Sequence, residues 1–163
     1  MAGLWRKIFR TGRVAEPAPV RPYATPAQGS VAAELAGSVQ VRHVDAGSCN
    51  GCEVEIGSAF GPVYDADRYG ARLVASPRHA DALLVTGPVT RNMAEPLRRT
   101  YAAVPTPKVV VAVGDCARNC GVFAGAYGVA GAVRDVVPVD MEIEGCPPRP
   151  EQIVAALRGL TGR

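Results

Sequence analysis

The sequence predicts an α/β fold built on an open, mainly parallel sheet. Segments with strand patterns alternate with helical segments, and short loops join them, as expected of parallel strands connected by right-handed crossovers. Of the 163 residues, 48% are hydrophobic and only 6% are aromatic, which suits a core of small aliphatic side chains. We expect one domain of this kind, over residues 38–163.

Five strands are expected, and three of them have clear signals. Residues 39–44 alternate between apolar and polar side chains, as a half-buried strand does. Residues 81–86 and 108–113 are largely apolar runs followed by glycine, which indicates strands buried on both faces. Weaker strands are expected over 73–75 and 136–139.

Three helices complete the alternation. Residues 53–61 follow the first cysteine pair and are expected to be helical. Residues 91–103 predict a second helix, which Pro105 ends. Residues 149–160 predict the closing helix, started by prolines and ended by Gly162.

The first 37 residues predict two segments outside this domain. Residues 1–13 place basic and apolar side chains at helical spacing, which indicates a basic amphipathic helix for a membrane surface or a partner groove; the alternative is a solvated tail. The basic residues are Arg6, Lys7, Arg10 and Arg13, and the apolar ones are Leu4, Trp5, Ile8 and Phe9. Residues 14–37 contain four prolines and are expected to form an extended linker.

Charge and hydropathy exclude several functional classes. The net charge is +3 without a basic face of interleaved aromatics, which argues against a nucleic-acid partner. No stretch approaches the ~20 apolar residues of a membrane span, and the N-terminus lacks the apolar core and cleavage site of a signal peptide. The longest uncharged run, 119–133, is expected to be a mobile loop or one packed against a cofactor. The odd count of five cysteines indicates a reducing compartment.

Four cysteines have the pattern of an iron–sulfur site. Cys49 and Cys52 form a close pair in which Gly51 permits a tight turn, whereas Cys116 and Cys146 stand apart. Each stretch follows the carboxyl end of a predicted strand or extended segment, and these ends share the edge of a parallel sheet where ligands bind. A cubane cluster requires four converging thiolates. The pattern therefore indicates electron transfer.

Other uses of the cysteines stay open at this point. A structural zinc site also takes four thiolates, although its usual signature is two close pairs. A thioredoxin-like dithiol would use Cys49 and Cys52 and leave the other two unexplained, and buried cysteines also serve as small hydrophobic residues. Cys120 competes with Cys116 as the third ligand. Cys116 is favoured because it directly follows a predicted strand.

Six motifs in the chain resemble those of one protein family. They are Cys49–Glu55, Ser76–Asp81, Thr86–Thr90, Gly114–Cys116, Gly121–Phe123 and Gly145–Pro150. The family comprises the small, cluster-bearing subunit of membrane-associated [NiFe] hydrogenases of the formate hydrogenlyase type and the homologous complex I subunit that carries the terminal [4Fe–4S] cluster beside quinone. The resemblance runs from Arg42 to Leu160.

The resemblance implies a flavodoxin-like domain with helices on both faces of the sheet and one [4Fe–4S] cluster at the carboxyl ends of its strands. Carried over by position, the ligands are Cys49, Cys52, Cys116 and Cys146, whereas Cys120 falls where relatives usually have a small residue, often Gly. The chain is then an electron-transfer subunit of a membrane-bound oxidoreductase complex, with no active site of its own. Its implied partners are a large catalytic subunit and the ferredoxin-type and membrane subunits of a complex at the cytoplasmic face of the membrane.

The first motif bears on the branch of the family. Asn50 and Gly51 separate the first two cysteines, as in the hydrogenase branch, whereas complex I subunits have adjacent cysteines there. A hydrogenase-like complex is therefore favoured, with a complex I-type quinone oxidoreductase as the alternative. The alternative from a different class is a zinc-stabilised scaffold without redox function.

Charged residues flank the predicted ligands. The negative carboxylate of Glu53 is expected to interact favourably with the positive end of the dipole at a helix N-terminus. The alternative role of Glu53 is a proton relay near the cluster. Asp115 flanks Cys116. Arg118 and Arg149 are candidates to donate hydrogen bonds to the cluster sulfurs or to contact the partner.

Overall fold

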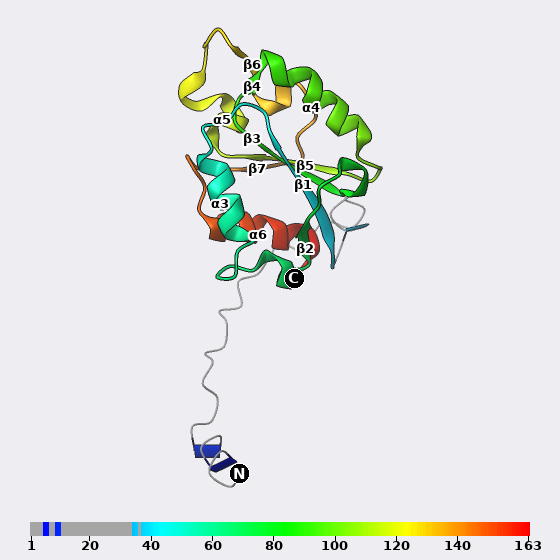
Figure 1. The fold of residues 1–163 in the computed structure, drawn as a ribbon, viewed down its shortest axis with the longest axis vertical. Helices are drawn as coiled ribbons and strands as arrows, with labels where there is room; N and C mark the ends of the chain where they lie inside the picture. The colour runs from blue at the N-terminus through cyan, green and yellow to red at the C-terminus, as the bar shows by residue number, and fades with distance from the viewer. Residues whose placement is uncertain (1–4, 7–8, 11–33, 36) are drawn as a thin grey trace.

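A five-stranded parallel sheet forms the centre of the molecule (Figure 1). The computed structural model describes residues 5–6, 9–10, 34–35 and 37–163. The strand order is β2-β1-β3-β5-β7, and all four neighbouring pairs are parallel. Along the chain this is the 2-1-3-4-5 order of flavodoxin-like sheets. The predicted open parallel sheet is confirmed.

The central strands are buried on both faces. The strands are β1 (Val39–Asp45), β2 (Ala71–Leu73), β3 (Ala82–Thr86), β5 (Val109–Val113) and β7 (Met141–Ile143). Every residue of β3 and β5 is buried, as expected where helices cover both sides of a parallel sheet. Side chains alternate between the two layers: Leu84 packs on one side and Leu83 on the other.

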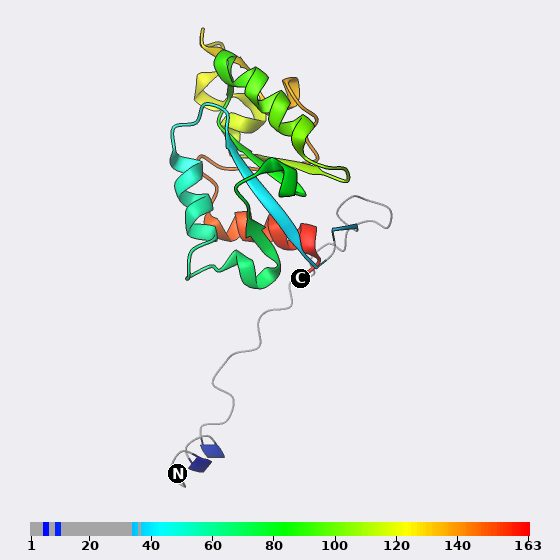
Figure 2. The ribbon, with the colours of Figure 1, turned by 45° about the vertical axis from the view of Figure 1, so that its right-hand side comes forward.

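Helices cover both faces of the sheet, as predicted (Figures 1 and 2). On one face lie α3 (Gly51–Ala59) and α6 (Pro150–Thr161), whose Ile56 and Leu157 belong to the same core cluster as Leu84. On the other face lies α4 (Arg91–Ala103), which buries Leu97. A short helix, α5 (Asp115–Asn119), follows β5 directly. The helix α3 begins two residues earlier than expected, so Cys52 lies within its first turn.

The strand expected over 136–139 is wrong. A 3-10 turn over Val133–Asp135 precedes this segment, and Val137 packs in the cluster under α4 instead of extending the sheet. The fifth strand is β7, at residues that the sequence pattern assigned to a connection. Asp140 fixes its place, because its amide donates to the Val110 carbonyl and its carboxylate accepts from the Val110 amide.

Two further differences concern short elements. The second strand lies at Ala71–Leu73, two residues before the expected position. The uncharged run 119–133 contains a 3-10 turn at Gly121–Phe123 and the strand β6 (Val129–Gly131), which pairs antiparallel with β4 (Val89–Thr90). This small ribbon joins the run to the start of α4.

The described residues among 1–13 are helical. Trp5 and Phe9 are exposed, and their rings stack with centroids 6.2 Å apart. The described basic residues of this segment are Arg6 and Arg10; the rest of the predicted amphipathic helix, and nearly all of the expected linker 14–37, lie outside the described residues. Among the described residues, no helix combines the length and apolar character needed to cross a membrane.

Candidate functional site

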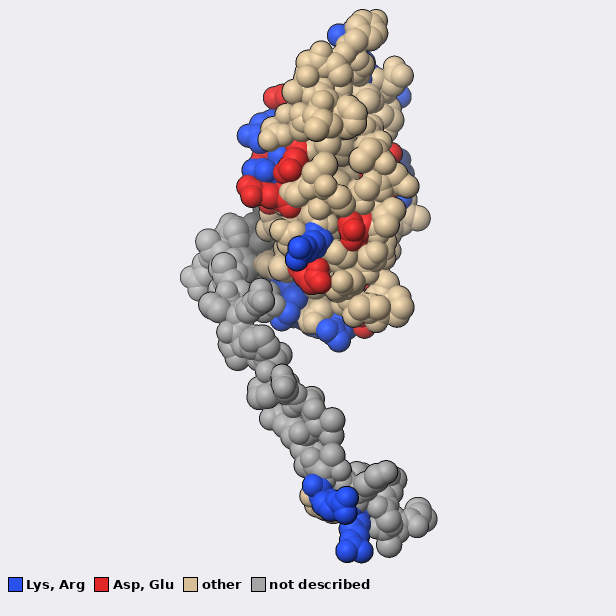
Figure 3. Space-filling view, turned by 90° about the vertical axis from the view of Figure 1, so that its left-hand side faces the viewer, with Lys and Arg blue, Asp and Glu red and all other residues tan. Residues whose placement is uncertain are grey.

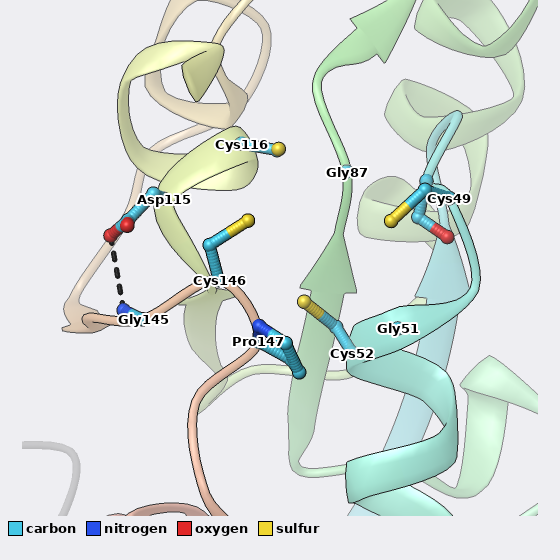
Figure 4. Close-up of a pocket in the computed structure, with 10 residues that line it drawn as sticks. Cys49, Gly51, Cys52, Gly87, Asp115, Cys116, Gly145, Cys146 and Pro147 are labelled. Atoms are coloured by element: carbon cyan, nitrogen blue, oxygen red, sulfur yellow. Dashed lines mark hydrogen bonds between the residues drawn. The ribbon is translucent and has the colours of Figure 1, made fainter. Parts of the chain in front are cut away.

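A cavity of about 100 Å³ lies at the carboxyl edge of the sheet (Figure 4). The loops after β1, β3, β5 and β7 all contribute to it, and it includes the position between β1 and β3 where the strand order reverses, which is where ligands bind in such sheets. All four cysteines expected as ligands line it. The lining residues are Ser48, Cys49, Gly51, Cys52, Gly87, Asp115, Cys116, Gly145, Cys146 and Pro147.

The loop after β1 is shaped by side chain-to-backbone hydrogen bonds. One carboxylate oxygen of Asp45 accepts from the amides of Gly47 and Ser48, both at 2.8 Å. Burial alone would raise the pKa of Asp45, but these two hydrogen bonds hold it below its usual value. The Ser48 hydroxyl in turn accepts from the Asn50 amide at 3.1 Å, and Asn50 adopts a left-handed conformation with φ of 71° before α3 begins. This turn presents Cys49 and Cys52 to the cavity.

The second half of the site joins α5 to the loop after β7. The Gly114 amide donates to the Ile143 carbonyl at 2.8 Å, and the Asp115 amide donates to the Gly145 carbonyl at 2.8 Å. The Gly145 amide returns a bond to the Asp115 carboxylate at 3.0 Å (Figure 4). These bonds bring Cys116 and Cys146 to the same side of the cavity.

Two glycines make room for the other parts of the site. Gly114 has φ of 87°, and a Cβ there would lie 2.7 Å from the Cys52 sulfur. Gly87 has φ of 74°, and a Cβ there would overlap the backbone of Ser48 in the Cys49 loop. Both positions combine a left-handed backbone with a close approach, which only glycine accommodates without strain.

The cavity offers its thiols no positive charge. Among the described residues that line it, none is Lys, Arg or His. Burial raises the pKa of Cys52 to about 12, with further contributions from Glu53 and the other three cysteines. Burial also raises the pKa of Cys116, and nearby Cys146 adds to the effect. Reactive cysteines need an electropositive setting and a lowered pKa, so Cys52 and Cys116 do not suit the role of a nucleophilic thiol.

The arrangement of the sulfurs bears on the choice between a single ion and a cluster. Within the described part of the chain, no three His, Cys, Asp or Glu side chains are placed to hold one metal ion. Structural zinc needs its sulfurs at about 2.3 Å from one centre. The four sulfurs here line one cavity, with Cys116 and Cys146 on one side and Cys49 and Cys52 on the other (Figure 4). Four thiols that line one cavity are a ligand set that structural zinc and iron–sulfur clusters both use.

Cys120 stands apart from the other four cysteines. It is absent from the lining of the cavity, and it ends α5 in a left-handed conformation with φ of 67°. Its amide donates to the Cys116 carbonyl at 2.9 Å. Left-handed helix ends favour glycine, which gives a physical reason for a small residue at this position.

Glu53 lies behind the cavity in a group that sequence reasoning missed. Its carboxylate accepts from the buried Thr86 hydroxyl at the end of β3 and lies 3.5 Å from the His43 ring on β1. Because Thr86 donates to Glu53, its oxygen accepts from His43 Nε2 at 2.9 Å. Burial lowers the pKa of His43, and Glu53 opposes that shift. The second Glu53 carboxylate oxygen is buried without a hydrogen-bond partner among the described residues.

The two arginines expected near the cluster differ in their contacts. Arg118 directs its guanidinium to the carboxylates of Asp115, Glu142 and Glu144. Arg149 is exposed, and its amide donates to the Gln152 side chain at the start of α6. Neither residue lines the cavity.

One known family matches most of the cysteine-bearing domain. Residues 49–160 match the family described as NADH ubiquinone oxidoreductase, 20 Kd subunit. The match covers more than half of the chain and includes all four cysteines of the cavity. The chain belongs to this family. The family resemblance recognised from the sequence motifs is therefore confirmed.

The 20 Kd subunit family includes relatives in both branches. A probable membrane-bound hydrogenase subunit of Pyrococcus furiosus is 49% identical over 114 residues, covering 70% of this chain and 68% of the relative. Formate hydrogenlyase subunit 7 of Escherichia coli is 45% identical over 123 residues, covering 76% of this chain and 48% of the relative, so the chain spans about half of that protein. An NADH-quinone oxidoreductase subunit of Herpetosiphon aurantiacus is 46% identical over 110 residues, covering 67% of this chain and 61% of the relative.

Solved structures agree with this assignment. A chain of the archaeal membrane-bound sulfane sulfur reductase superposes with a TM-score of 0.68 at 32% identity, covering 79% of this chain and 71% of that one. A chain of an NAD⁺-reducing [NiFe]-hydrogenase superposes with a TM-score of 0.55 at 21% identity, covering 70% and 85% of the two chains. The second likeness shows a shared fold.

Gly114→Ala tests the close packing around Cys52. The added methyl group meets the sulfur and the backbone is left-handed, so we expect the free energy of unfolding to fall by about 2 kcal/mol or more. Gly159→Ala in α6 is the matched control, because its Cβ meets nothing within 4 Å, and it should change stability by no more than about 1 kcal/mol. Pulse proteolysis over a urea series measures both. Equal stabilities of the two variants would contradict this account.

Proposed function

We propose that the chain is an electron-transfer subunit that holds one [4Fe–4S] cluster through Cys49, Cys52, Cys116 and Cys146. The observation that carries the proposal is the meeting of four thiols in one cavity whose lining, in the described part of the chain, contains no Lys, Arg or His. A [4Fe–4S] cluster takes four cysteine thiolates, and its iron supplies the positive charge that the protein does not. When bound, the cluster supplies one-electron redox chemistry.

The chain's own residues hold the thiols and exclude water from part of the site. Cys52 and Cys116 are buried, with 9% and 8% of their surface exposed. Cys49 and Cys146 are exposed. Protein therefore covers the cavity at Cys52 and Cys116, and its open side is where Cys49 and Cys146 reach the surface. An electron-transfer cluster there needs a partner to cover this open side.

The surface beside the open side supports such a partner. Val122 and Tyr127, in the uncharged run after α5, are 85% and 86% exposed. A groove of about 500 Å³ lies between this run and Cys146, with Asn119, Gly121 and Val122 among its lining residues. Figure 3 shows an area without charged side chains over the upper part of this side of the molecule, with charged side chains along the left margin and in the lower half. Large exposed apolar side chains grouped on a surface, such as Val122 and Tyr127, mark protein interfaces. The proposed occupant is the large catalytic subunit of the complex.

The first motif favours a hydrogenase-type complex within the family. Asn50 supplies the left-handed turn between the two cysteines. A Cβ on Gly51 would lie at the ordinary contact distance of 3.6 Å from the Cys49 sulfur, so it is Asn50 that shapes the ligand loop. A complex I-type quinone oxidoreductase is the second candidate. Its NADH-quinone oxidoreductase relative is 46% identical to this chain, close to the 49% and 45% of the hydrogenase relatives.

The N-terminal segment supports attachment at the cytoplasmic face of the membrane. Trp5 and Phe9 present a stacked, exposed aromatic pair, and Arg6 and Arg10 supply positive charge. Aromatic and basic side chains on one short helix bind anionic lipid surfaces. The segment therefore joins the complex to lipid or to a membrane subunit, while the cysteine domain carries the electrons.

Single cysteine replacements test the cluster. Replacing Cys49, Cys52, Cys116 or Cys146 by Ala removes one of four thiolate ligands, and we expect the iron content to fall at least about tenfold. Iron analysis and low-temperature paramagnetic resonance of the anaerobically purified complex are the measurements. Cys120→Ala is the control and should keep both iron and signal.

Two results would contradict the ligand assignment. A full [4Fe–4S] signal in any of the four single variants would remove that cysteine from the ligand set. A colourless protein that contains zinc and no iron would favour the scaffold without redox function.

Charged substitutions test the proposed docking surface. Val122→Glu with Tyr127→Glu places two carboxylates on the uncharged run, and we expect about a tenfold loss of the co-purified large subunit. Val63→Glu is the matched control, because Val63 is also 80% exposed but lies beside Tyr64 and α6, away from the cysteines. Equal recovery of the large subunit with both variants would place the interface elsewhere.

Removal of residues 1–13 tests the membrane attachment. Each basic residue near an anionic leaflet contributes about 1 kcal/mol, so the truncated protein should shift from the membrane to the soluble fraction, and more so at high salt. Iron content should not change. The exposed pair Arg98→Gln and Arg99→Gln on α4 is the control for lost charge. Undiminished sedimentation of the truncated complex with membranes would show that the segment is not needed.

A further inference from the structure

One guanidinium connects the two elements that carry Cys116 and Cys146. Arg118 lies on α5, two residues after Cys116, and its side chain is only 22% exposed. Its Nε donates to Glu142 at 3.1 Å, its Nη1 to Asp115 at 3.3 Å and its Nη2 to Glu144 at 2.8 Å. Glu142 is in β7, and Glu144 follows β7 two residues before Cys146.

We propose that Arg118 is a positioning residue that fixes the place of Cys116 relative to Cys146. This inference rests on the proposed function, because the spacing of these thiols matters only if they hold one cluster. The helix α5 has five residues, which is too short to be stable without tertiary contacts. The position of α5 therefore depends on its bonds to β7, the strand beside β5 in the sheet, and to the loop that follows β7.

Arg118 acts on the Cys146 loop through Asp115. The same Asp115 oxygen, Oδ1, accepts from Arg118 Nη1 and from the Gly145 amide. The residue after Gly145 is Cys146. The guanidinium thus orients the carboxylate that binds the backbone next to this thiol, in addition to its own contacts with Glu142 and Glu144.

A second arginine completes the group. Arg134 Nη2 lies 2.8 Å from Glu142 Oε1 and donates to the Arg118 carbonyl at 2.8 Å. Glu142 therefore contacts two cations, and both the side chain and the backbone of Arg118 are bound. Networks of this kind restrict geometry more than an isolated surface pair does.

The geometry of the contacts requires arginine. Three different nitrogens of one rigid plane reach three carboxylates, whereas a lysine ammonium is a single point charge on a flexible stem. Arg118→Lys therefore keeps the charge near the cluster and loses the clamp. If charge alone mattered, lysine would restore the properties of the wild type.

Arg118→Lys in the full complex tests the inference, with Arg99→Gln as the control because it breaks an exposed pair on α4. For Arg118→Lys we expect assembly as in the wild type, an altered paramagnetic resonance signal of the reduced cluster, and about tenfold faster loss of colour with an iron chelator. Arg99→Gln should match the wild type in all three measurements. A wild-type signal and a wild-type rate of colour loss in Arg118→Lys would overturn the inference.

A second variant keeps the test decisive if Arg118→Lys does not assemble. Glu142→Gln retains the size of the side chain and removes the carboxylate that both arginines contact, so it should change the signal and the rate in the same direction. Wild-type behaviour of this variant would then overturn the inference. Absence of any cluster from the wild-type complex would instead overturn the proposed function and this inference with it.

Discussion

Parallel pairing of β1, β3, β5 and β7 is the constraint on which the site depends. Because all these strands run in one direction, the loops that follow them meet at one edge, although Cys49 and Cys146 are almost a hundred residues apart in the sequence. The same pairing buries β3 and β5 completely, which holds that edge rigid. The cysteines therefore meet through the topology of the sheet, and the loops only refine their positions.

The loops refine these positions by close packing and by charge. Because Gly87 has no Cβ, the backbone of the Cys49 loop can pack directly against it. Because Gly114 has no Cβ, the Cys52 sulfur can do the same there. Carboxylates then bind the amides of the loops: Asp45 orders the first one and Asp115 the last. Two of the thiols receive no such support, since burial raises the pKa of Cys52 and Cys116. In the proposed complex, the iron of the cluster supplies the positive charge that stabilises their thiolate forms.

The sequence predicted features that follow from local pattern and missed those that depend on tertiary register. The strands β1, β3 and β5 were predictable, because the pattern of each strand lies within a few residues. The convergence of the four cysteines followed from these strands, because the cysteines lie near strand ends that share one edge of a parallel sheet. The fifth strand was not: Val137 is apolar because it packs under α4, while β7 is a three-residue edge strand with one buried residue. The bonds of Thr86 to His43 and Glu53, and those of Arg118 to Glu142 and Glu144, join residues more than twenty positions apart, so no local pattern predicts them.

The unequal exposure of the cysteines sets an order for assembly of the proposed complex. Among the described residues, Cys49 and Cys146 are exposed whereas protein covers Cys52 and Cys116, so iron reaches the cavity past the exposed pair. A large subunit docked on the uncharged surface would cover that same entrance. Cluster insertion must then precede docking, and a chain that meets its partner too early would remain empty. In the proposed complex, the open side of the cavity is thus the entrance for the cluster as well as the route by which electrons pass.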